Sequence, residues 1–303
     1  MSSRPLVLAL LAALALSACG NEAPVAAPAT PRPAPSPSLS LTPGGPVAAS
    51  PAPGPAGPTV LASGLEAPWG IGFLPGGDAL VSERDSARVL RIPADGGEPV
   101  EVTTITQAEP AGEGGLLGLA VSPSFATDGL VFAYVTTDQD NRIVRFRLDA
   151  PGRVEPVLTG IPKGRIHNGG RLAFGPDGML YAGTGDTGDT DLARDPDSLG
   201  GKVLRMTADG QPVAGASSLV FSSGHRNVQG LAFDDAGRLY ATEFGQNRFD
   251  EVNQVEQGDD GGWPEVEGAG DGGGRFAAPI VTWETSEASP SGAVCQPIAT
   301  GTV

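Results

Sequence analysis

Cysteine, histidine and basic residues are scarce in this sequence. Two cysteines in 303 residues cannot build a disulfide scaffold. Only 19 residues are basic against 35 acidic ones, and the net charge of −16 excludes nucleic acid as a partner, because its phosphates require a basic face. The chain has two histidines, His167 and His225, so each of them stands out as a candidate for chemistry.

The N-terminus has an apolar run, residues 6–16, that is too short to span a bilayer and fits the core of a signal peptide. Small residues then precede Cys19, as in bacterial lipoprotein signals. We predict a lipoprotein signal peptide over 1–19 and lipidation of Cys19. An ordinary signal peptide with a chance cysteine is the alternative. We expect an extracytoplasmic protein, anchored to the bacterial cell membrane only by this lipid.

Residues 20–58 are dominated by proline and alanine. Such a segment has too little apolar surface to bury, and its prolines keep it extended, so we predict a disordered linker. About 245 residues follow, from 59 to 303, which is enough for one large all-β domain.

Glycine is abundant, with 45 residues placed between short apolar runs, which favours many tight turns. Four segments share an apolar strand, a Pro/Asp/Gly turn and a second apolar strand. Their register marks are Phe73, Val121, Phe174 and Phe233, spaced by 48, 53 and 59 residues. Similar periods with several strands per unit are typical of propeller blades.

Further strands follow these segments at residues 88–92, 142–148 and 202–206, where basic and apolar residues alternate with period two. This alternation predicts one buried and one solvated face. After residue 268 the repeat fails, although 279–283 fits one strand and 289–292 resembles the start of another blade. We therefore predict about four complete blades and a partial fifth.

Five ordered motifs between residues 60 and 292 resemble the soluble quinoprotein glucose/sorbosone dehydrogenase family, nearest to its PQQ-dependent aldose sugar dehydrogenases. They lie at 112–118, 167–172, 224–231, 262–264 and 288–292. The resemblance implies a six-bladed β-propeller that binds pyrroloquinoline quinone (PQQ) and Ca²⁺ at its top face. Family members continue beyond the last motif through further strands, so we interpret this chain as C-terminally truncated and expect its function to be impaired.

The resemblance also implies roles for single residues. His167 matches the catalytic base that takes the proton of the sugar's anomeric hydroxyl while hydride passes to the quinone, a task that suits histidine near neutral pH. Arg226 and Asn227 match cofactor contacts, and the guanidinium can stabilise charge that develops on reduction. Glu113 matches a cofactor-contacting glutamine, but a carboxylate beside an anionic quinone requires compensation.

Gly245 and Gln246 match the loop whose backbone carbonyls bind the active-site Ca²⁺, a hard cation that prefers oxygen ligands. A second acidic segment, residues 186–191, also offers spaced oxygen ligands. It lacks the spacing of an EF-hand, so we interpret it as a solvated loop. Among the other candidates, His225 is expected to be structural, and the three tryptophans are expected to pack between blades.

Three functions remain open at this stage. The first is oxidation of an aldose to its lactone with PQQ and Ca²⁺, with a small sugar as substrate and an electron acceptor that the motifs do not identify. The second is a catalytically inactive, surface-tethered propeller that binds a carbohydrate or a protein. The third is a propeller hydrolase of the lactonase kind, which requires several metal ligands in its channel and fits the motifs around His167 and Arg226 less well.

Overall fold

A computed structural model describes residues 59–270 and 272–296 of the chain. The predicted signal peptide 1–19, the lipidation site Cys19, the linker 20–58 and the final residues 297–303 lie outside the described residues. Within the described part, no helix is long and apolar enough to cross a membrane.

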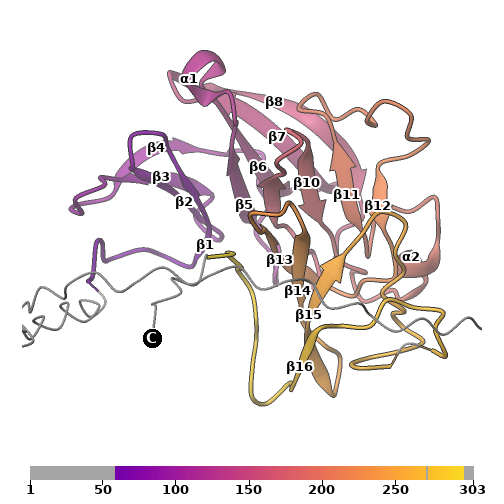
Figure 1. Cartoon of the computed structure of the whole chain (residues 1–303). Coiled ribbons are helices and arrows are strands. Elements are labelled where there is room, and N and C mark those ends of the chain that lie inside the picture. Colours follow the sequence, from indigo (N-terminus) through magenta and orange to yellow (C-terminus); the bar gives the residue numbers. More distant parts are fainter. Residues whose placement is uncertain (1–58, 271, 297–303) are drawn as a thin grey trace, which may run out of the picture. The chain divides into compact units, whose positions relative to one another are not determined.

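Four antiparallel sheets of four strands each make up the described part of the chain (Figure 1). We call them blades 1 to 4. Each is formed by strands that follow one another in sequence, as the repeat predicted. Blade 1 contains β1 (Pro68–Phe73), β2 (Ala79–Glu83), β3 (Arg88–Ile92) and β4 (Val100–Thr104). Blade 2 contains β5 (Leu116–Val121), β6 (Leu130–Thr136), β7 (Asn141–Arg147) and β8 (Ala150–Ile161).

Blade 3 contains β9 (Leu172–Phe174), β10 (Leu180–Gly183), β11 (Val203–Met206) and β12 (Val220–Ser222). Blade 4 contains β13 (Val228–Phe233), β14 (Leu239–Glu243), β15 (Phe249–Val255) and β16 (Val281–Glu284). The only helices of the described residues are single turns, α1 (Phe125–Asp128) and α2 (Asp191–Arg194). The protein is therefore an all-β propeller, as predicted.

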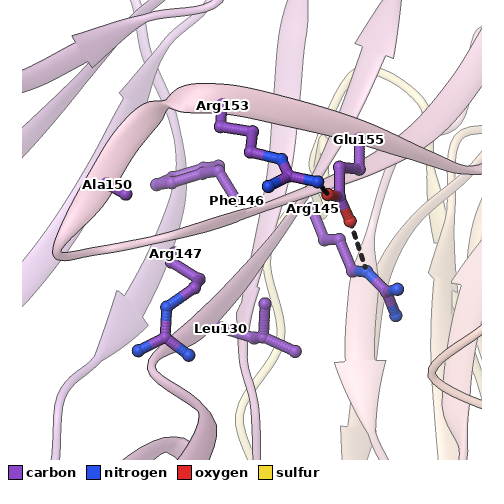
Figure 2. Close-up of a pocket in the computed structure, with 7 residues that line it drawn as sticks. All are labelled: Leu130, Arg145, Phe146, Arg147, Ala150, Arg153 and Glu155. Atoms are coloured by element: carbon purple, nitrogen blue, oxygen red, sulfur yellow. Dashed lines mark ion pairs between the residues drawn. The ribbon is translucent and has the colours of Figure 1, made fainter.

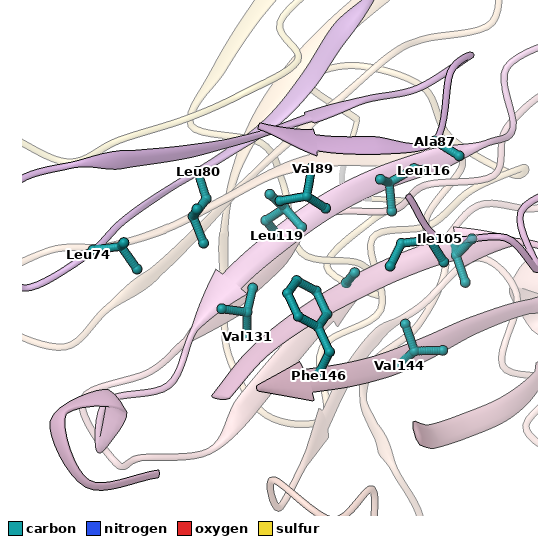
Figure 3. Packing of buried hydrophobic residues seen from close by; sticks show 12 residues of the cluster. Leu74, Leu80, Ala87, Val89, Ile105, Leu116, Leu119, Val131, Val144 and Phe146 are labelled. Carbon is teal, nitrogen blue, oxygen red and sulfur yellow. The ribbon is translucent and has the colours of Figure 1, made fainter. Parts of the chain in front are cut away.

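Consecutive blades bury their apolar faces against each other. Leu80 and Val89 of blade 1 pack with Leu119, Val131 and Phe146 of blade 2 in one core cluster (Figure 3). Further clusters join blade 2 to blade 3 and blade 3 to blade 4. Because the first strand of each blade contacts the first strand of the next, these strands gather around a common axis.

The prediction that one face of the third strands is solvated is wrong for β7. Val144 belongs to the cluster shared with blade 1, and Ile143 belongs to the cluster shared with blade 3. Both are fully buried, because a blade inside a stack is covered on both faces.

The predicted strand near residue 280 is β16, which pairs with β15 and completes blade 4. No strand follows it in residues 285–296. The segment around Ser291 nevertheless lies against blade 4, because the Thr242 hydroxyl donates to the Ser291 carbonyl at 2.7 Å. A Cβ at Gly230 would stand 2.4 Å from the same carbonyl oxygen, so only glycine allows this approach.

Candidate active site

His167 lies in the loop that joins β8 to β9, and only 6% of the residue is exposed. Its backbone has a φ of 52°, in the left-handed region that few non-glycine residues adopt. The His167 carbonyl packs closely on the next loop: a Cβ added to Gly185 would lie 1.9 Å from the carbonyl oxygen. Backbone strain of this kind persists where the surroundings fix a residue, and it is frequent at functional sites.

Asp186 orients the imidazole of His167. Its Oδ1 lies 2.6 Å from His167 Nδ1, and its Oδ2 accepts a hydrogen bond of 2.8 Å from the indole of Trp263. Burial raises the pKa of Asp186, but hydrogen bonds from His167, the Gly188 amide and Trp263 outweigh burial and hold the pKa below its ordinary value. An ionised carboxylate only accepts, so Nδ1 carries the proton and Nε2 carries the lone pair.

Arg226 covers the basic nitrogen of His167. It lies between β12 and β13, and its Nη2 donates to His167 Nε2 at 2.7 Å. Its Nε and Nη2 also donate to Gln246 Oε1, at 2.9 and 2.6 Å, and its Nη1 donates to the Phe244 carbonyl. Burial lowers the pKa of Arg226. The predicted catalytic pair, which is 59 residues apart in sequence, is therefore in direct contact.

Glu267 fixes the loop that holds Arg226. Its Oε1 accepts hydrogen bonds from four successive backbone amides, of residues 246 to 249, at 2.8 to 3.2 Å. Burial raises the pKa of Glu267, but these backbone donors outweigh it and lower the pKa below the ordinary value. A charged carboxylate in a nest of amides is a strong local anchor, so Glu267 sets the position of the Gln246 side chain.

Glu113 and Asn227 complete the loop cluster. Glu113 Oε2 accepts a hydrogen bond of 2.7 Å from the His167 backbone amide. Asn227 Oδ1 accepts from the Gly169 amide at 3.0 Å, while its Nδ2 is buried and has no partner. An unpaired buried donor is costly unless a ligand satisfies it. The structure thus brings both predicted cofactor contacts to His167, and their role toward a cofactor stays a prediction.

The predicted calcium ligands lie at the same mouth. Gly245 and Gln246 follow β14, and the Gly245 amide donates to Asp250 at 2.9 Å. In the described residues no group of three or more His, Cys, Asp or Glu side chains could hold a metal ion. A calcium ion at this loop would depend on backbone carbonyl oxygens.

His225 is buried between blade 3 and blade 4, in surroundings that fit the prediction of a structural histidine. Its Nδ1 lies 2.5 Å from Glu243 Oε1, and its Nε2 lies 2.7 Å from the Ser222 hydroxyl. Burial alone lowers the pKa of His225, but the charge of Glu243 and the hydrogen bond to it outweigh burial and raise the pKa. Glu251, beside this pair, is desolvated and faces the Glu243 charge, which raises its pKa to about 7.

Three residues of the site were not predicted from the sequence. The interpretation of 186–191 as a solvated loop is wrong for Asp186, which is 1% exposed. Trp263 was expected to pack between blades, and it does reach from the loop after β15 of blade 4 to Asp186 of blade 3. Its place in the site was not predicted: the indole donates to Asp186, and the ring lies 5.7 Å from the Arg226 guanidinium. Glu267 lies outside the motifs that the sequence analysis identified. A histidine near an Asp-rich loop of the same blade is the signal that could have found Asp186.

The fold and the site together define a β-propeller with a histidine–carboxylate pair and an arginine at the mouth where its loops converge. The sequence profile described as Glucose / Sorbosone dehydrogenase matches residues 65–297. The match covers well over half of the chain, and the chain belongs to this family.

Relatives with known names support the same assignment. Quinoprotein glucose dehydrogenase B of Acinetobacter calcoaceticus is 30% identical over 256 residues, which cover 71% of this chain and 54% of that protein. An aldose sugar dehydrogenase of Escherichia coli is 27% identical over 225 residues, covering 68% of this chain and 61% of that protein. The chain therefore spans little more than half the length of these relatives.

Among solved structures, the PQQ-bound form of an aldose sugar dehydrogenase from Streptomyces coelicolor is similar to this chain. The two share 53% sequence identity and superpose with a TM-score of 0.75, over 78% of this chain and 74% of that one. A glucose dehydrogenase structure from a Thermus species shares 40% identity with a TM-score of 0.67, over 74% and 71% of the two chains.

Proposed function

We propose that this protein oxidises an aldose sugar at its anomeric hydroxyl to the lactone, with PQQ as hydride acceptor and Ca²⁺ as an auxiliary ion. The observation that carries the proposal is the contact of His167 with ionised Asp186 on one side and Arg226 on the other. The names of the similar proteins support PQQ and a sugar.

His167 Nε2 is the atom that takes the proton of the sugar hydroxyl. Asp186 holds the proton on Nδ1 and stabilises the imidazolium that forms when Nε2 is protonated. Arg226 must first release Nε2, and its Nη2 then becomes available to an oxygen that gains negative charge. Gln246 and the Phe244 carbonyl keep the guanidinium at the mouth during this exchange.

The residues present fit a polar, anionic cofactor. Arg226 supplies charge, and Asn227 Nδ2 supplies a buried donor that lacks a partner. When bound, PQQ supplies the two-electron acceptor, while the protein orients it and excludes water. Ca²⁺ on the carbonyls of Gly245 and Gln246 would act as a Lewis acid toward the quinone oxygens.

A dye-linked assay with aldoses, with and without added PQQ and Ca²⁺, tests this function. We expect sugar oxidation that requires PQQ and is lost in His167→Ala. The matched control is His225→Ala, which removes the other histidine. Oxidation that is independent of PQQ would refute the proposal, and sugar binding without turnover would favour the inactive binding propeller.

We further propose that Cys19 carries the lipid anchor and that the protein acts outside the bacterial cell membrane. The support is the sequence around residues 6–20. Mass spectrometry of the mature N-terminus from native membranes tests this, and Cys19→Ser releases the protein from the membrane fraction if the proposal is correct.

A further inference from the structure

Arg171 is a buried guanidinium for which the described residues provide no acidic partner. It directly precedes β9, and only 8% of the residue is exposed. Burial lowers its pKa to about 10, and no acidic group of the described residues opposes this shift. Arginine is rarely buried unless it is paired, because desolvating a charge is costly. The position therefore requires an explanation.

The side chain of Arg171 lies where the innermost strands of the blades meet. Its Nε donates to the carbonyl of Gln229, in β13, at 2.7 Å. Its Cζ lies 4.3 Å from the centre of the Trp69 ring, in β1. Gly118, in β5, lies against its backbone, and Nη2 lies beside Gly292. Contacts with blades 1, 2 and 4 from a residue of blade 3 place Arg171 on the axis of the propeller.

The arginines at the outer edge of blade 2 provide a comparison. Arg145, Arg147 and Arg153 line a hollow between β7 and β8, where Figure 2 shows Arg145 and Arg153 paired with Glu155. Arg147 pairs with Asp149. These side chains are more exposed than Arg171, yet each has a carboxylate. Of these four arginines, Arg171 is the most buried, and it alone has no carboxylate partner among residues 59–270 and 272–296.

A second donor lies beside Arg171. The Gln229 side chain is 9% exposed, and its Oε1 accepts a hydrogen bond of 2.9 Å from the Ser291 hydroxyl. This leaves its Nε2 without a partner in the described residues. Ser291 adjoins Gly292, which lies beside Arg171 Nη2, so both sets of donors border the same region. Donors that converge without an acceptor form a site for an anion.

We propose that the axis of the propeller holds a small monovalent anion of the size of chloride, bound by Arg171 and Gln229 against the Trp69 ring. One guanidinium calls for one negative charge. The Trp69 ring, 4.3 Å from Arg171 Cζ, and Gly292 beside Nη2 border the space around the guanidinium, which favours a small anion. None of these residues belongs to the proposed sugar site. The anion site can therefore be tested independently of the proposed enzymatic function.

Quenching of tryptophan fluorescence by iodide tests the site, because Trp69 stacks on Arg171. In the intact protein, with sodium sulfate holding the ionic strength constant, we expect a saturable component of quenching at low iodide that chloride removes by competition. Trp69→Phe should lose this component. Arg171→Met should weaken it about tenfold or more, since it removes charge-assisted hydrogen bonds, and Arg171→Lys should retain part of it.

The wild-type result is decisive even if a variant does not fold. Quenching that rises linearly with iodide and is unchanged by chloride would overturn the proposal. Crystals soaked in bromide give a second test: an anomalous peak at Arg171 supports the site, and water alone at that position refutes it.

Discussion

The two histidines lie in similar places in adjacent blades, one residue apart in register, and have different partners. In blade 3, His167 precedes the first strand, and Asp186 follows the second strand and binds its Nδ1. In blade 4, His225 precedes the first strand, and Glu243 ends the second strand and binds its Nδ1. The same unit, a histidine with a carboxylate, is thus built twice by the same repeat.

The second ring nitrogen distinguishes the two units. His225 Nε2 meets the hydroxyl of Ser222, at the end of β12 in blade 3, so the ring is enclosed between blades 3 and 4. His167 Nε2 meets Arg226, which arrives from the neighbouring blade and is held by an exposed loop. The repeat provides the orientation of both histidines, and they differ in whether a buried hydroxyl or the guanidinium of Arg226 lies on the second ring nitrogen.

The largest effect is expected from Asp186→Asn. An amide can donate to Nδ1, which places the proton on Nε2 and removes the base. We expect the kcat/KM for sugar oxidation to fall about 10²–10⁴-fold in the dye-linked assay. Glu243→Gln, the matching change in blade 4, should reduce turnover far less. Equal losses in the two variants would contradict the distinction between the histidines.

Glu267→Ala should loosen the loop that holds Arg226. We expect about a tenfold loss of kcat/KM, because Arg226 loses the fixed position of Gln246, together with faster hydrogen exchange at the amides of residues 246–249. Glu267→Gln, which retains an acceptor oxygen, should show a smaller change in both. Unchanged exchange in Glu267→Ala would show that the loop is held by other contacts.

His225→Ala should act on stability. It leaves Glu243 and Ser222 without their partner in a buried position, so we expect the free energy of unfolding to fall by about 1–3 kcal/mol in chemical denaturation. His167→Ala, at the mouth, should cost less stability while it abolishes activity. A higher free energy of unfolding in His225→Ala would show that the buried pair of His225 and Glu243 destabilises the protein.

The smallest effect is a pH dependence of stability. Glu251 has an ordinary pKa of about 4.3 when unfolded and about 7 in the folded protein, and the pKa of His225 is also raised. A raised folded pKa gives stability that is present below the unfolded value and is lost as the pH rises through the folded value. We expect denaturation midpoints to fall from pH 5 to pH 8, and Glu251→Gln to flatten this slope.

The blades were predictable because their determinants are local. Strands such as β2 and β14 are apolar runs bounded by turns that contain proline, aspartate and glycine, and each pairs with its sequence neighbour. The burial of β7 on both faces was not predictable, since it depends on the blades that cover it and not on its own alternation of residues.

In the site, the sequence singled out His167, Arg226 and Asn227 because they sit in dense motifs, and the structure places them at one mouth. Asp186 was not predicted, because a run of Asp, Thr and Gly has the composition of a solvated loop. Glu267 was not predicted either, because its partners are backbone amides, which have no sequence signature. Both assignments depend on contacts between residues 18 or more apart, which the fold creates and composition does not reveal.

The contact between Arg226 and His167 has a consequence for the chemical reactivity of the resting protein. Acylating reagents such as diethyl pyrocarbonate attack the free nitrogen of a neutral imidazole, and neither ring offers one, because one is enclosed and the other is covered by a guanidinium. The resting protein should therefore resist carbethoxylation. A compound that draws the guanidinium away would unmask a single reactive ring, and the reagent would then report the exposure of the proposed catalytic base.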